Sequence, residues 1–182
     1  AFLGQAWLAN TGAYSAFGIL TYHLPQWFAQ RDWPADRYGW FLGAILAAQT
    51  LVFLWLGLGR RRDWSPWRLW GPQLACLAAV AVLPVWQSFG LLLLTAPVVG
   101  VGCGVSYQAS LVASLHEAAG RGRRAGIHEG LIGAGGFAPP LLAGLLVRGG
   151  LPLASPYVLA AALIGLALLG QVVVWRRAVS RP

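Results

Sequence analysis

The segment PYVLAAALIGLALLGQVVVW, residues 156–175, decides the fold class of this chain. It contains no charged side chain and consists almost entirely of Ala, Leu, Val and Gly. A helix needs about 20 apolar residues to cross the hydrocarbon core of a bilayer, because each residue adds about 1.5 Å along the helix axis. The segment therefore predicts a transmembrane helix.

Five further stretches have the same length and character. The six predicted helices cover residues 2–28, 38–58, 68–86, 88–115, 125–147 and 156–176. The composition agrees, since 58% of the residues are hydrophobic and 10% are charged, whereas about 25% are charged in a soluble domain. The polar surface is too small to cover a water-soluble globule. The sequence therefore predicts an all-α, polytopic transmembrane helical bundle in one domain, residues 1–182, surrounded by a lipid bilayer.

The connections between these stretches differ in charge. Two of them and the tail after the last stretch share ten arginines: Arg60, Arg61, Arg62, Arg68, Arg121, Arg123, Arg124, Arg176, Arg177 and Arg181. The remaining connections carry only Arg31, Arg37 and Arg148. Arginine is enriched in cytoplasmic loops. We therefore expect an integral protein of the bacterial plasma (inner) membrane, with the first set and both termini in the cytoplasm.

The net charge of +8 comes from arginine alone. A basic chain can bind nucleic acid, but these arginines form short clusters between apolar runs, as expected next to anionic lipid headgroups. No nucleic-acid partner is expected. Cys76 and Cys103 lie inside apolar runs without metal-ligand neighbours, which predicts buried free thiols, no metal site and no cofactor. Because Met is absent even from position 1, we expect a fragment or an excised domain.

Polar side chains gather on the predicted helices over residues 2–28 and 88–115. On each helix they fall on one face, as the helical period requires. Polar groups in a membrane helix face the bundle interior or an aqueous cavity. The predicted lining of a substrate cavity is Asn10, Tyr14, Thr21, Gln49, Tyr107, Gln108 and Ser110. The alternative is that these groups hold helices together without touching a solute.

The helices over 68–86 and 156–176 are nearly free of polar residues and are expected to face lipid. Polar and apolar helices thus recur with a period of three helices. Internal repeats of this kind are typical of secondary transporters. The pattern predicts two three-helix inverted repeats.

The helix over 125–147 carries a row of small residues and two prolines. Small residues let helix backbones approach closely, and proline removes a backbone donor and bends a helix. The residues predicted to pack or bend this helix are Gly133, Gly136, Pro139, Pro140 and Gly144. Such a bend would permit a rocking motion, whereas pure packing is the simpler interpretation.

A charged patch precedes this row. Glu129 falls about one turn inside the predicted span, where a carboxylate is costly unless it is paired. The predicted cytoplasmic latch consists of Arg123, Arg124, His128 and Glu129. The alternative is a proton relay through His128 or Glu129, which makes protons a candidate coupling ion.

Sequence patterns for intramembrane enzymes are weak. The stretch GVSY, residues 104–107, has only a loose likeness to a serine-protease motif, and HEGLI, residues 128–132, lacks the second His of a metalloprotease motif. No catalytic residue is expected.

Three stretches carry a resemblance: YQASL at 107–111, GRGRRAGIHE at 120–129 and GAGGFAPPLLAG at 133–144. They resemble helices 10 and 11 of major facilitator superfamily (MFS) transporters. Six helices, cytoplasmic termini and a basic loop after the second helix are similar to the C-terminal half of that fold. The loop GLGRRRD at 57–63 departs from the family's loop motif in its glycine spacing and lacks the early Asp.

The resemblance implies a secondary transporter that moves a small organic solute by alternating access, together with an N-terminal six-helix half as partner. It also implies that the helices over 2–28 and 88–115 line the central cavity. The alternative is a six-helix membrane protein of another class, such as a permease subunit or a scaffold without its own transport cycle.

Overall fold

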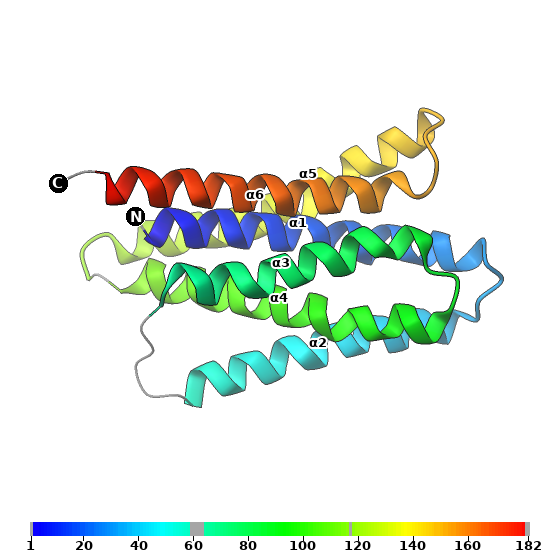
Figure 1. Cartoon of the computed structure of the whole chain (residues 1–182), viewed down its shortest axis with the longest axis horizontal. Helices are drawn as coiled ribbons and strands as arrows, with labels where there is room; N and C mark the ends of the chain where they lie inside the picture. The colour runs from blue at the N-terminus through cyan, green and yellow to red at the C-terminus, as the bar shows by residue number, and fades with distance from the viewer. Residues whose placement is uncertain (1, 59–63, 117, 181–182) are drawn as a thin grey trace.

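The computed structural model describes residues 2–58, 64–116 and 118–180, which form a bundle of long helices (Figure 1). The helices are α1 (Phe2–Ala29), α2 (Ala35–Leu58), α3 (Pro66–Val82), α4 (Phe89–Leu115), α5 (Arg121–Arg148) and α6 (Ser155–Val179), and a short 3-10 helix, η1 (Leu83–Val85), follows α3. The described residues include no strand. The predicted all-α bundle of six helices is confirmed.

Most helix ends lie within three residues of the predicted bounds, and two differ by four. Helix α5 begins at Arg121, four residues before the predicted start, after Gly120 with a φ of 73°. Glycine adopts this left-handed conformation without steric cost, so the arginines expected in a loop lie in the first turn of α5. Helix α3 ends at Val82 and continues as η1, because Pro84 has no N–H to extend the α-helical hydrogen bonds.

Five helices in the described part of the chain are long and apolar enough to cross a membrane: α2, α3 together with η1, α4, α5 and α6. Helix α1 has 28 residues and is more polar. It packs against all five other helices, so its polar face is shielded from lipid. The length and composition of these helices support an integral membrane protein.

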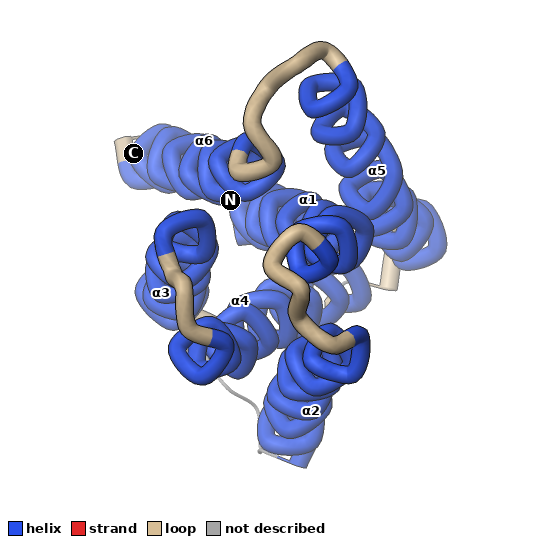
Figure 2. Tube along the Cα trace, turned by 90° about the vertical axis from the view of Figure 1, so that its right-hand side faces the viewer, coloured by secondary structure: helices blue, strands red, loops and turns tan. Residues whose placement is uncertain are grey.

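The helices form two three-helix units with matching contacts. Helix α1 packs closely on α5 and α6, α4 packs closely on α2 and α3, and α1 contacts α4 between the units. Exchanging α1 with α4, α2 with α5 and α3 with α6 preserves these principal contacts. Figure 2 shows α1 and α4 in the middle, α3 and α6 on one side, and α2 and α5 on the other. The beginning of α1 and the end of α6 lie at the same end of the bundle (Figure 1).

Burial divides the helices into central and outer ones. In the apolar window of α4, 56% of the residues are buried, compared with 22% in α2, 17% in α5 and 22% in α6. The expected outer position of α6 agrees with these values, but α2 and α5 are exposed to a similar degree. Apolar composition alone therefore does not distinguish a surface that meets lipid from one that meets another protein unit.

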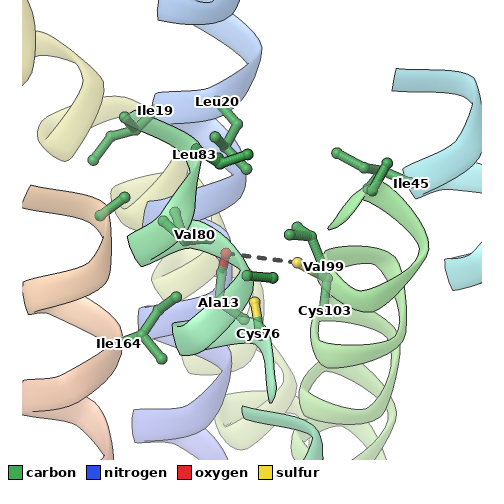
Figure 3. Close-up of a cluster of buried hydrophobic side chains, with 14 of the residues drawn as sticks. Ala13, Ile19, Leu20, Ile45, Cys76, Val80, Leu83, Val99, Cys103 and Ile164 are labelled. Carbon is green, nitrogen blue, oxygen red and sulfur yellow. Dashed lines mark hydrogen bonds between the residues drawn. The ribbon is translucent and has the colours of Figure 1, made fainter. Parts of the chain in front are cut away.

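Small residues bring the central helices close together. A Cβ added to Gly102 would lie 2.7 Å from the Cβ of Cys76, and one added to Gly12 would lie 2.7 Å from that of Ala167. Cys76 and Cys103 are buried and free, as predicted. Figure 3 shows this core, where the Cys103 thiol donates to the carbonyl of Ala13 over 3.7 Å.

Candidate functional site

A cluster of buried polar side chains lies where α1, α4 and α5 meet. Asn10, Ser110 and His128 are each 0% exposed. His128 Nδ1 lies 2.7 Å from Ser110 Oγ and 3.4 Å from Asn10 Nδ2. One imidazole nitrogen therefore joins three helices in the interior of an apolar bundle. We call Asn10, Ser110 and His128 the central cluster.

Aromatic side chains extend the central cluster toward α2. The ring of Tyr107 lies 5.0 Å from that of His128, 6.0 Å from that of Tyr14 and 5.2 Å from that of Phe53. Gln49, on α2, donates from Nε2 to the hydroxyl of Tyr14 over 2.9 Å. Tyr14 and Tyr107 are half-buried. They therefore form the accessible margin of an otherwise enclosed polar site.

Two atoms of the central cluster have no hydrogen-bond partner. Asn10 Oδ1 and His128 Nε2 are buried and unpaired, as is the hydroxyl of Ser106 on α4. A buried polar group without a partner costs about 1–3 kcal/mol. Most buried polar groups are paired, so each unpaired one calls for an explanation, which can be a bound solute, an ordered water or local strain.

The free nitrogen of His128 faces a carboxylate. His128 Nε2 lies 3.8 Å from Glu129 Oε1, beyond hydrogen-bond distance. The side chain of Glu129 is 64% exposed, whereas that of His128 is fully buried. These two neighbouring residues of α5 thus connect the interior of the bundle to its surface.

A second contact joins α1 and α4 next to the central cluster. Trp7 donates from its indole nitrogen to Ser114 Oγ over 3.0 Å. Sequence reasoning did not assign these two residues to the cavity. Their spacing could have indicated it, because Trp7 lies three residues before Asn10 and Ser114 lies four after Ser110, which places each pair on one helix face.

The structure brings together five of the seven residues predicted to line a cavity: Asn10, Tyr14, Gln49, Tyr107 and Ser110. Gln108 is half-buried beside Tyr107 and takes no part in these hydrogen bonds. Thr21 lies elsewhere. Its hydroxyl donates to the carbonyl of Phe17 over 2.8 Å, and its own carbonyl accepts from Tyr38 over 2.9 Å.

The residues predicted to form a latch are divided in the structure. His128 belongs to the central cluster, and Glu129 faces it from the surface. Arg123 is exposed and Arg124 is half-buried in the first turns of α5. A cytoplasmic latch remains a prediction.

The small residues of α5 meet α1 over part of the predicted row. A Cβ on Gly18 would lie 3.0 Å from Gly136 and from Pro140, which shows how closely the backbones approach. The carbonyl of Pro140 accepts from His23 Nε2 over 3.0 Å. Gly144 lies near His23, Pro139 is half-buried, and Gly133 is exposed with open space around its Cα. Helix α5 continues through both prolines.

Ser110 and His128 have the spacing of a nucleophile and its base. Ser110 lies inside α4, where the neighbouring backbone N–H groups take part in helical hydrogen bonds and cannot stabilise an oxyanion. Both side chains are fully buried. The described residues include no group of three His, Cys, Asp or Glu side chains that could hold a metal ion. Ser110 therefore has no backbone oxyanion site within α4.

No protein-family model matches the chain, and no curated protein matches its sequence significantly. The central cluster and the exposed helices around it are therefore the features that indicate a function.

Proposed function

We propose that this chain is the C-terminal six-helix half of an MFS-type secondary transporter, which moves a small organic solute across the bacterial plasma membrane by alternating access. Its basic loops and both termini face the cytoplasm. One observation carries the proposal: the central cluster places incompletely paired polar groups inside an otherwise apolar bundle.

The chemistry of the cluster suits a solute that forms hydrogen bonds. Asn10, Gln49 and the two tyrosine hydroxyls offer donors and acceptors, and the rings of Tyr14 and Tyr107 offer apolar faces. Ligand sites commonly combine aromatic walls with a few polar groups that set orientation. The half-buried tyrosines are the side chains that a solute would meet first.

In this proposal a second protein unit covers α2 and α5, which lie on one side of the central helices. Helices α2 and α5 flank α1 and α4 on the side opposite α3 and α6 (Figure 2). They expose large apolar side chains, among them Trp40, Leu51 and Trp55 on α2, and Phe137 and Leu141 on α5. An N-terminal six-helix half that covers this side would enclose the central cluster. Rocking of the two halves would then open it to either side of the membrane.

Uptake into proteoliposomes tests this proposal. We would reconstitute the full-length protein and measure the accumulation of radiolabelled sugars, amino acids, nucleosides and aromatic acids. Asn10→Ala and Tyr107→Phe should reduce transport at least about tenfold, as loss of one buried hydrogen bond can. Thr21→Ala is the matched control on α1 and should transport like the wild type. Absence of uptake of every solute, or unchanged uptake in both cluster variants, would contradict the proposal.

Cysteine labelling separates a transporter from a scaffold. In a variant with Cys76→Ala and Cys103→Ala, a cysteine placed at Gln49 would be treated with a membrane-impermeant maleimide from either side of the membrane. Alternating access predicts labelling from both sides. A scaffold or a permease subunit without its own cycle predicts labelling from one side at most.

A further inference from the structure

Solute binding leaves two neighbouring groups without a function: the unpaired Nε2 of His128 and the exposed carboxylate of Glu129. We propose that His128 and Glu129 form a proton-binding site, which is loaded and unloaded during the transport cycle. This inference rests on the proposed function for its place in a cycle, but the site itself can be tested without transport.

The position of His128 suits a stored proton. Its Nδ1 is held by Ser110 at 2.7 Å and lies 3.4 Å from Asn10, which fixes the ring between three helices. Its Nε2 is buried without a hydrogen-bond partner. Glu129 Oε1 lies 3.8 Å from Nε2. The ring is therefore oriented, and one of its nitrogens faces the carboxylate.

A single proton changes which atoms of the cluster donate hydrogen bonds. A neutral imidazole has one nitrogen without a proton. When a proton from water forms an N–H bond there, both nitrogens become donors, Nδ1 to Ser110 Oγ and Nε2 toward Glu129. The amide of Asn10 can turn its otherwise unpaired oxygen toward Nδ1. Breaking the same N–H bond returns the proton to water, and no electrons are exchanged.

The charge of the pair explains why the proton matters. With neutral His128 the pair carries the negative charge of Glu129, and with protonated His128 it is neutral overall. An ionised carboxylate that loses contact with water in a membrane is costly unless it is paired. A second protein unit can therefore cover Glu129 at lower cost when His128 holds a proton. This links proton loading to the covered state of the cycle.

Glu129 is the acidic side chain that pairs with His128 when the titratable groups on the neighbouring helices are compared. Helices α1, α4 and α6 pack against α5. The titratable side chains that face the site are Tyr14 from α1 and Tyr107 from α4. The titratable side chains of α6 are Tyr157, Arg176 and Arg177, which stand at its two ends. Within α5, Arg121, Arg123 and Arg124 precede the pair and Arg148 ends the helix.

Histidine NMR tests the site directly. The full-length protein, labelled with ¹⁵N-histidine and placed in lipid nanodiscs, would be titrated over roughly pH 5–8, the range in which histidine commonly changes charge. His128→Asn assigns the signal. Glu129→Gln should require an about tenfold higher proton concentration to protonate His128, because it removes the opposite charge. Because the side chain of Glu129 is exposed, the Glu129→Gln variant is expected to fold like the wild type.

Two controls accompany this titration. Asp36→Asn removes a carboxylate from the start of α2 and should leave the His128 titration unchanged. The signal of His23, which bonds the carbonyl of Pro140, should not respond to Glu129→Gln. A His128 signal that stays neutral throughout, or that shifts equally in the two variants, would overturn the proton site.

Transport distinguishes failure of this inference from failure of the proposed function. A Glu129-dependent titration without any solute uptake would support the proton site and reject the transporter. Solute uptake that is indifferent to a pH gradient and to both His128→Asn and Glu129→Gln would support the transporter and reject proton loading. Uptake that depends on the pH gradient in the wild type, but not in His128→Asn or Glu129→Gln, would support both the transporter and the proton site.

Discussion

Two of the buried polar contacts between helices differ in how completely they are paired. Between α3 and α6, Gln73 donates to Gln171 over 3.2 Å, and Gln171 donates back over 2.9 Å. Each amide also donates to a carbonyl of its own helix, that of Leu69 or Ala167. In the central cluster, by contrast, Asn10 Oδ1 and His128 Nε2 are left without partners.

Under the proposed function, this difference distinguishes a contact that only joins helices from a site that binds a solute. Both contacts are almost completely buried, so burial does not distinguish them. In the glutamine pair every polar atom has a partner within the protein, as expected of a contact that joins membrane helices. The unpaired atoms of the central cluster remain available to a solute or a proton. Four substitutions test this contrast, in order of decreasing effect.

Gln73→Leu should have the largest effect on stability. It leaves the Gln171 amide buried with fewer partners, which costs about 2–3 kcal/mol. The double variant Gln73→Leu/Gln171→Leu should recover most of this loss, since replacing both partners with apolar groups is nearly neutral. Denaturant unfolding in detergent micelles measures both. Equal losses in the single and double variants would show that the pairing is unimportant.

Gly102→Ala should destabilise the side of the bundle that contains the glutamine pair by about 1–2 kcal/mol, because overpacking forces neighbours to shift. The added methyl group would lie 2.7 Å from the Cβ of Cys76. Gly133→Ala is the matched control on α5, where nothing lies within 4 Å of the new atom. It should be neutral or stabilising by up to about 1 kcal/mol. The same unfolding assay compares the two, and equal effects would refute the close α3–α4 contact.

Ser110→Ala should cost about 1 kcal/mol or less in stability, since it removes one partner of an incompletely paired histidine. Its effect on solute uptake should be larger than its effect on unfolding. A stability loss as large as that of Gln73→Leu would mean that the central cluster serves mainly to hold the helices together, and the contrast would fail.

Thr21→Ala should have the smallest effect, within about 0.5 kcal/mol. The hydroxyl of Thr21 bonds a carbonyl of its own helix, and the carbonyl that accepts from Tyr38 is kept. Unfolding and uptake should both match the wild type. Loss of uptake at normal stability would extend the solute site along α1.

Hydrophobic patterns were sufficient to predict the number of helices and most of their bounds. They also identified Asn10, Tyr14, Gln49, Tyr107 and Ser110, because polar residues are conspicuous in apolar helices. They did not predict the position of His128 in the cluster, since a helical pattern shows which residues share a face but not which helix that face meets. Near Gly135 and Gly136, α5 approaches α1 closely enough to bring His128 to Asn10.

The glutamine pair was missed for a related reason. Gln73 and Gln171 each stand alone in a helix that otherwise resembles a lipid-facing segment, so no stripe indicates a partner. Their pairing depends on the contact between α3 and α6, which joins residues 98 positions apart. The beginning of α5 was placed too late because a run of glycines and arginines is typical of a loop as well as of a first helical turn.

The polar character of the central helix α1 has a consequence for how the protein is made. Helix α1 is synthesised before α4, α5 and α6, which begin at Phe89, Arg121 and Ser155. Lipid alone holds a helix of lower hydropathy weakly, and Asn10 and Tyr14 lack their contacts to His128 and Tyr107 until later helices emerge. Biogenesis is therefore not a simple sequence of independent insertions. The ribosome must deliver α4 and α5 before α1 is secured, so retention of α1 in the bilayer depends on helices that are synthesised after it.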